Sequence, residues 1–202
     1  MATSFADAVE MGVKTVKYLT ISKYRGRKLQ RPFFMRGAET VARELLGAVL
    51  VRTVNGLRRT ALITETEAYV GTHDLACHAS KGRTRRTEIM FGPAGYAYVY
   101  LIYGMYNMLN IVTAAEGDAQ AVLFRSAEPM DDWDADLCGP GKLARAFHIT
   151  LADRGLDVTG DDLYIVKNPH YQLKVTTTPR IGIDYAGEWK HAPLRFVGTR
   201  TQ

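Results

Sequence analysis

The chain has 202 residues, which one compact domain accommodates, because chains usually divide only beyond roughly 250–300 residues. Hydrophobic residues at 47% and charged residues at 23% exclude collagen-like, coiled-coil and largely disordered proteins. No apolar run reaches the roughly 18 residues of a membrane helix, and residues 1–30 lack the apolar block of a secretory signal. We therefore expect a cytoplasmic protein, nuclear in a eukaryote, with no membrane partner. Cys77 and Cys138 lack CxxC spacing, which argues against a disulfide scaffold and a structural zinc site.

The net charge of +5 is concentrated at the N-terminus. Residues 1–36 hold eight basic residues against Asp7 and Glu10, a net +6, whereas the other 166 residues hold 18 basic and 19 acidic residues, a net −1. Basic blocks of this kind often bind nucleic acid; the alternative is a solvated tail or an expression remnant. We expect a basic N-terminal extension over residues 1–30, for which disorder is one alternative, and one domain over residues 31–202.

Local patterns predict the elements in chain order. Ala38 to Leu46 has the apolar spacing of one helical face, with Gly47 as its C-cap. Strands on either side of Asn55-Gly56 predict a hairpin. The polar stretch 70–95 reads as a long loop, which in a compact domain is usually functional. The other expected elements are strands at 49–54, 57–69, 96–102, 108–113, 119–126, 163–166 and 180–183, and a helix from Gly139-Pro140-Gly141 to Phe147.

Two groups of side chains stand out. In the strand that contains Glu65, Glu67 and Tyr69, period-two alternation places these three on one face. If that face lines a pocket, repulsion and desolvation raise one carboxyl pKa and provide a general base; the alternative is a solvated pair. Tyrosine is the second group, because five of eleven lie between Tyr96 and Tyr106. Tyr103, beside Gly104, is expected to protrude from a turn and to stack on or wedge between bases; the alternative is an ordinary aromatic sheet face.

Six motifs in series resemble the alkyladenine (3-methyladenine) DNA glycosylase family. The order and spacing agree over residues 31–196, and only the first thirty or so residues fall outside. The motifs are Glu65-Thr66-Glu67-Ala68-Tyr69, Ala76-Cys77-His78, the segment from Tyr98 to Tyr106, Arg125-Ser126-Ala127-Glu128-Pro129, Gly139-Pro140-Gly141-Lys142-Leu143, and Arg180-Ile181-Gly182-Ile183 with Pro193-Leu194-Arg195-Phe196.

The resemblance implies a single α+β domain with a curved, mainly antiparallel sheet flanked by helices. It implies a DNA repair enzyme that flips a damaged purine out of the duplex and hydrolyses its N-glycosidic bond. Because no lysine occurs among the matched pocket positions, we expect a monofunctional enzyme, with no metal and no cofactor. Double-stranded DNA with a damaged purine is the expected partner, and a monomer is expected. Glu67 would activate the water, which Arg125 and the carbonyl of Ile183 would help to hold.

Further roles follow from matching positions in the family. Tyr69, His78 and Tyr100 would enclose the flipped base, Tyr98 would orient the His78 ring, and Asn110 would disfavour the amino group of guanine. Tyr103 would fill the gap in the duplex, and Met105, Tyr106 and Lys142 would contact the DNA.

The chemistry of the residues agrees with these roles. Aromatic rings offset the cost of extruding a base, and cationic alkylated purines are attracted to electron-rich rings. A carboxylate takes a proton from water while stabilising an oxocarbenium-like sugar. Taken singly, Arg125 is also an ordinary ion-pair partner, Asn110 a turn amide, His78 a mimic of a metal ligand and Lys142 a residue of a plain helix start.

Two other function classes stay open. A non-catalytic protein that recognises damaged DNA would keep Tyr103 and the basic extension without needing Glu67. A hydrolase of small nucleosides or glycosides would use Glu65 and Glu67 and would need no protruding tyrosine. Asp184-Tyr185 and the short acidic stretch from Asp131 to Asp136 depart from the family pattern, which bears mainly on substrate range.

Overall fold

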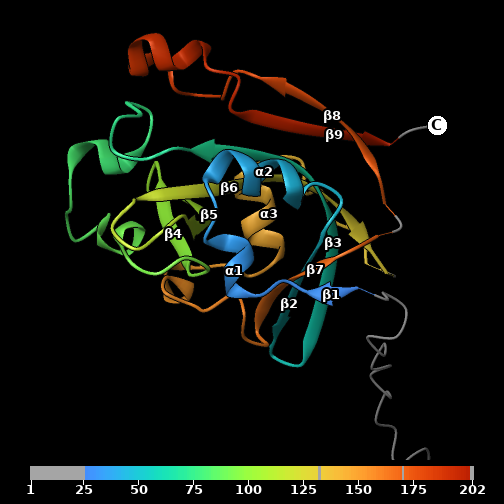
Figure 1. The fold of residues 1–202 in the computed structure, drawn as a ribbon. Coiled ribbons are helices and arrows are strands. Elements are labelled where there is room, and N and C mark those ends of the chain that lie inside the picture. Colours follow the sequence, from blue (N-terminus) through green and yellow to red (C-terminus); the bar gives the residue numbers. More distant parts are fainter. Residues whose placement is uncertain (1–25, 132, 170, 201–202) are drawn as a thin grey trace, which may run out of the picture.

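The computed structural model of the protein describes residues 26–131, 133–169 and 171–200. One antiparallel sheet organises this part of the chain (Figure 1). Its strands run in the order β1-β7-β2-β3-β6-β5-β4, and β9 pairs with both β3 and β8. This arrangement confirms the predicted α+β class. The strands are β1 (Arg27–Lys28), β2 (Val49–Val54), β3 (Leu57–Tyr69), β4 (Ala97–Ile102), β5 (Tyr106–Thr113), β6 (Gln120–Met130), β7 (Leu163–Lys167), β8 (Leu173–Thr178) and β9 (Arg195–Arg200).

The helices are short. The α-helices are α1 (Arg31–Phe34), α2 (Ala38–Leu45) and α3 (Pro140–Ala146), and the 3-10 helices are η2 (His78–Lys81), η3 (Glu88–Phe91), η4 (Leu151–Asp153) and η5 (Asp184–His191). The predicted helices at 38–46 and before Phe147 are therefore confirmed as α2 and α3. Within the described residues, no helix combines the length and apolar composition needed to cross a membrane.

Strand β3 is the long central strand of the sheet. Asn55 and Gly56 both have positive φ angles, +50° and +73°, so the predicted tight hairpin joins β2 to β3. The first half of β3 pairs with β2, its residues 65–67 pair with β9, and β6 pairs along most of its other edge. A register irregularity at Glu65 interrupts the β3–β6 pairing. Residues 65–67 thus lie between two strands from the later half of the chain.

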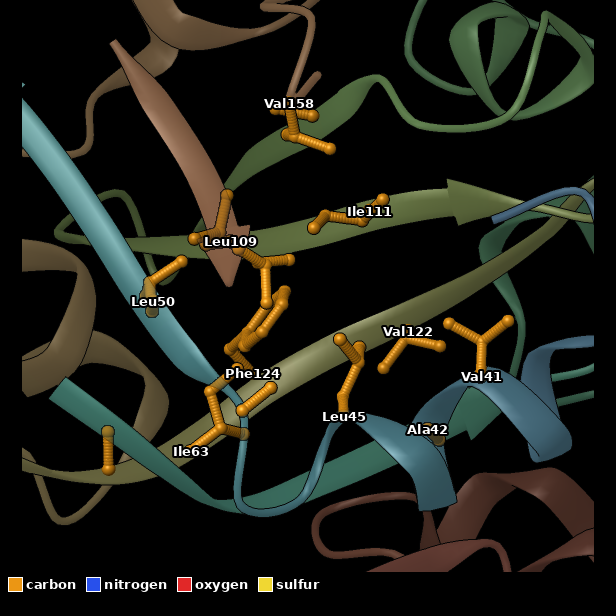
Figure 2. Packing of buried hydrophobic residues seen from close by; sticks show 14 of the residues in the cluster. Val41, Ala42, Leu45, Leu50, Ile63, Leu109, Ile111, Val122, Phe124 and Val158 are labelled. Atoms are coloured by element: carbon orange, nitrogen blue, oxygen red, sulfur yellow. The ribbon is translucent and has the colours of Figure 1, made fainter. Parts of the chain in front are cut away.

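The core forms where α2 and α3 pack on the sheet. Val41, Ala42 and Leu45 on one face of α2 are fully buried, together with Ile63 of β3 and Phe124 of β6. Figure 2 shows these residues in one cluster between α2, β3 and β6. Burial of a large apolar side chain contributes about 1.5–3 kcal/mol, so this packing fixes β3 and β6 relative to each other.

The predicted strand at 180–183 is wrong. Arg180 turns its side chain inward to pair with Asp74, and Gly182 has a φ of +76°, which extended strand does not adopt. The amide of Ile181 donates to Glu67 rather than to a neighbouring strand. The strand in this part of the chain is β8, which ends before Arg180. Its successive threonine side chains point to opposite faces of the sheet.

The basic extension lies mostly outside the described residues, which begin at Gly26. Three of the basic side chains described near its end are paired within the fold, Lys28 with Asp161, Arg31 with Asp157 and Arg36 with Glu44, whereas Arg27 is exposed. Strand β1 also pairs with β7. The hypothesis of a nucleic-acid-binding extension over residues 1–30 stays a prediction, because most of that segment lies outside the described residues.

The contrast between Gly47 and Gly56 tests the packing beside α2. The φ angle is +80° at Gly47 and +73° at Gly56. A Cβ added at Gly47 would lie 2.7 Å from the Tyr171 carbonyl oxygen, whereas a Cβ added at Gly56 would have no atom within 4 Å. We expect Gly56→Ala to cost roughly 1–2 kcal/mol from backbone strain alone. Gly47→Ala should cost clearly more. Denaturant unfolding measures both losses, and equal losses would contradict the packing constraint at Gly47.

Candidate functional site

A cavity of about 310 Å³ opens where β3 ends. Figure 1 shows this end of the sheet bordered by the connection from β3 to β4, in green, and by the segment with η5, in red. The two segments touch, because the Tyr185 hydroxyl donates to the Ala76 carbonyl over 3.4 Å. Eight of the twelve predicted site residues line the cavity: Tyr69, His78, Tyr98, Tyr100, Tyr103, Asn110, Arg125 and Ile183.

Glu67 lies behind the cavity wall and is 0% exposed. It is not among the lining residues, but three groups that bind it belong to residues that are. Its Oε1 accepts a hydrogen bond from the Ile181 amide over 2.9 Å and lies 3.3 Å from Arg125 Nη1. Its Oε2 accepts from the Tyr69 hydroxyl over 2.9 Å. Burial raises the pKa of the Glu67 carboxyl, while Arg125, the Ile181 amide and Tyr69 act in the opposite direction.

Glu65 and Arg125 connect Glu67 to two neighbouring strands. Arg125 Nε donates to Glu65 Oε1 over 3.0 Å, and Arg195 of β9 donates to the same oxygen over 2.5 Å. Ser126 donates to the other Glu65 oxygen over 3.1 Å. The predicted common face of Glu65, Glu67 and Tyr69 is therefore confirmed, and its two carboxylates share one guanidinium instead of repelling each other across a solvated surface.

A buried ion pair that sequence reasoning missed lies behind Tyr69. Arg180 and Asp74 form two hydrogen bonds, over 2.5 and 2.8 Å, and both side chains are fully buried. Arg180 also donates to the Ala68 carbonyl and lies 4.8 Å from the centre of the Tyr69 ring. Burying two charges is tolerated only when they are paired and hydrogen-bonded. The pair therefore connects the 70–95 stretch, the end of β3 and the segment 180–183.

His78, Tyr98 and Tyr100 form an aromatic wall. His78 Nδ1 lies 2.9 Å from the Tyr98 hydroxyl, and the His78 and Tyr100 rings meet edge to face with their centres 4.6 Å apart. Burial, and secondarily the charge of Arg86, lowers the pKa of His78 to about 4, so the ring is neutral near pH 7. Burial also raises the pKa of Tyr98 and Tyr100, which keeps both phenols protonated.

The remaining predicted pocket residues make defined contacts. Asn110 is buried, and its Nδ2 donates to the carbonyls of Tyr98 and Met108 over 3.2 and 3.4 Å. The carbonyl of Ile183 accepts a hydrogen bond from the Ala186 amide over 2.9 Å. Since a carbonyl has two lone pairs, the Ile183 carbonyl can accept a second hydrogen bond, and Ile183 lines the cavity.

Exposed apolar side chains surround the mouth of the cavity. Tyr103, at the tip of the β4–β5 turn with a φ of +53°, is 83% exposed, as its position beside Gly104 predicts. Met105 and Tyr106 are also exposed, although Gly141 of α3 packs against the Tyr106 ring. Ile181 and Tyr185, which sequence reasoning did not assign, expose apolar surface on the other border of the cavity.

Lys142 lies outside the cavity and pairs with Asp136, with Nζ 2.6 Å from Oδ2. Both side chains are more than half exposed, and exposed pairs of this kind contribute little stability. Within the described part of the chain, no three His, Cys, Asp or Glu side chains group as metal ligands would.

Known proteins resemble this chain over most of its length. The family model described as "Methylpurine-DNA glycosylase (MPG)" matches residues 32–202. A relative from Anaeromyxobacter sp. (strain Fw109-5), named "Putative 3-methyladenine DNA glycosylase", is 50% identical over 171 residues, covering 84% of this chain and 88% of the relative. A relative with the same name from Legionella pneumophila (strain Corby) is 48% identical, and the match covers 84% of this chain and 93% of the relative. Another, from Myxococcus xanthus (strain DK1622), is 49% identical, and the match covers 83% of this chain and 88% of the relative.

The match extends over most of the chain and includes every motif on which the resemblance rested. The cavity, the buried carboxylate and the exposed tyrosine turn all lie within the matched residues. The chain therefore belongs to the methylpurine-DNA glycosylase family.

Proposed function

We propose that this protein is a monofunctional DNA glycosylase that flips a damaged purine out of duplex DNA, hydrolyses its N-glycosidic bond and so initiates base excision repair. Alkylated and deaminated purines, including 3-methyladenine, hypoxanthine and ethenoadenine, are the proposed substrates. The observation that carries the proposal is the fully buried Glu67, held by Arg125, Tyr69 and the Ile181 amide at the wall of an aromatic cavity.

The proposed reaction uses Glu67 as a general base. One carboxylate oxygen takes a proton from water as the water oxygen bonds to C1′ of the sugar and the bond to the purine nitrogen breaks, its electron pair leaving with the base. A general base contributes about 10²–10⁴-fold to such a step. Arg125, 3.3 Å from Glu67, and the acceptor capacity of the Ile183 carbonyl support a role of both in holding the water. A cationic purine leaves neutral, whereas a neutral purine requires a proton.

Base capture is assigned to the cavity and its mouth. Tyr69, His78 and Tyr100 supply ring surface for a flipped purine, and Tyr98 orients His78 through the 2.9 Å contact. Tyr103 fills the gap in the duplex. Its contacts with the neighbouring bases offset the cost of unstacking the flipped base, which is about a few kcal/mol. A strand-cutting glycosylase needs an amine nucleophile, and no lysine is among the described residues that line the cavity, which supports base release without strand cleavage.

Glu67→Gln is the experiment that tests this function. We expect single-turnover base release from a duplex with one hypoxanthine, revealed by alkaline cleavage of the abasic site, to fall on the order of 10²–10⁴-fold while lesion binding persists. Glu65→Gln is the matched control on the same strand and should cost less, because it weakens the contacts with Arg125, Arg195 and Ser126 but leaves the proposed base in place. Undiminished release by Glu67→Gln would refute the assignment. Binding without release by the unaltered protein would favour a non-catalytic damage-recognition protein.

The pH dependence of base release provides a second test. Glu67 must be ionised to act as a base, and burial raises its pKa above the ordinary 4.5. The rate should therefore fall with decreasing pH, with the midpoint of that limb above 4.5. Arg125→Gln removes a charge that lowers this pKa, so the limb should move to higher pH. A limb that moves to lower pH in this variant would contradict the role of Glu67.

Tyr103→Ser tests the role of the exposed turn. Because the ring is 83% exposed, its removal should leave the free energy of unfolding nearly unchanged. We expect weaker binding and slower release on duplex DNA, with much smaller effects on a single-stranded substrate that needs no plug. Tyr103→Phe should retain the duplex activity, since it keeps the ring. Equal losses on duplex and single strand would argue against insertion into the duplex.

A further inference from the structure

Arg86 is the one cavity-lining residue with a charge for which no ion pair is found among the described residues. The other arginine of the lining, Arg125, binds Glu65 and Glu67, and Arg180 behind the wall binds Asp74. The carboxylates of the site are thus already compensated. Arg86 is left as a positive charge at the wall where the base is proposed to bind.

The contacts of Arg86 direct this charge at the aromatic wall. Its guanidinium carbon lies 5.1 Å from the centre of the Tyr100 ring, and Nη2 lies 3.4 Å from His78 Nε2. A guanidinium only donates hydrogen bonds, so Nε2 must be the unprotonated nitrogen of a neutral His78. The proton on Nδ1 then faces the Tyr98 hydroxyl, 2.9 Å away. Arg86 therefore contacts two of the three rings proposed to enclose the base.

The backbone that carries Arg86 is anchored. Arg154 Nη2 donates to the carbonyls of both Arg85 and Arg86, over 2.7 and 2.5 Å. The next residue, Thr87, is buried and donates to the Gly82 carbonyl over 2.8 Å. Arg86 thus extends into the cavity from a fixed point, while its exposed side chain retains freedom to adjust to a bound base.

We propose that Arg86 determines the charge preference of the pocket by favouring neutral purines that present a hydrogen-bond acceptor and disfavouring cationic alkylated purines. This inference rests on the proposed glycosylase function. A cationic base would compete with the guanidinium for the Tyr100 face and be repelled by it. A neutral base with an acceptor, such as the O6 of hypoxanthine, would accept a hydrogen bond from it. This modifies the expectation that the tyrosine rings simply attract cationic bases.

The test compares two duplexes that differ only in the lesion, hypoxanthine or cationic 7-methylguanine. Single-turnover release rates are measured for the unaltered protein, Arg86→Gln and Arg86→Lys. Arg83→Gln is the matched control, because Arg83 lies in the same loop against Phe91 and does not line the cavity. We expect Arg86→Gln to raise the ratio of 7-methylguanine to hypoxanthine release roughly tenfold, and Arg86→Lys and Arg83→Gln to leave it nearly unchanged.

The same comparison is made for binding in a Glu67→Gln background, where affinity is measured without base release. A rise in the 7-methylguanine preference on replacing Arg86 supports the proposal by either readout. An unchanged ratio, or an equal loss with both lesions as expected for a plain phosphate contact, overturns it. Because the affinity ratio needs no turnover, absence of base release would refute the proposed catalysis without obscuring the result for Arg86.

Discussion

The burial of the Glu67 carboxylate is the interaction on which the site depends. A carboxylate away from water is costly unless charge and hydrogen bonds compensate it, and the compensating groups come from three parts of the chain. Tyr69 follows on the same strand, Arg125 belongs to β6, and the Ile181 amide precedes η5. Satisfying one side chain therefore brings the end of β3, its neighbouring strand and a C-terminal segment to one point.

A second buried charge pair completes the walls around that point. The pairing of Asp74 with Arg180 holds the long connection after β3 against the segment 180–183 and places a guanidinium behind Tyr69. The connection has little regular structure beyond two short 3-10 helices, so polar contacts of this kind order it. Its irregular backbone lets His78 and Arg86 approach the cavity from outside the sheet, which a strand in register would not allow.

Charge is distributed unequally between the two sides of the cavity. Behind the wall at Glu67, each cation is matched by a carboxylate. At the aromatic wall, Arg86 lacks such a partner among the described residues. On the proposed function, the paired side would serve the chemistry of bond cleavage, and the unpaired side would serve the choice of base.

The sequence alone determined features that depend on local backbone geometry. The Asn55-Gly56 turn, the common face of Glu65, Glu67 and Tyr69, the protruding Tyr103 and the family motifs were all readable, because turn residues and period-two alternation act over a few positions. The tertiary structure alone decided that Glu67 is buried and which groups compensate it. In the tertiary structure, residues 180–183 form an irregular segment instead of the expected strand. The buried pairing of Asp74 and the contacts of Arg86 with the aromatic wall are also visible only there. Burial and charge pairing in the site join residues far apart in the sequence, such as Glu65 and Arg195, which are 130 positions apart, and no local spacing encodes such contacts.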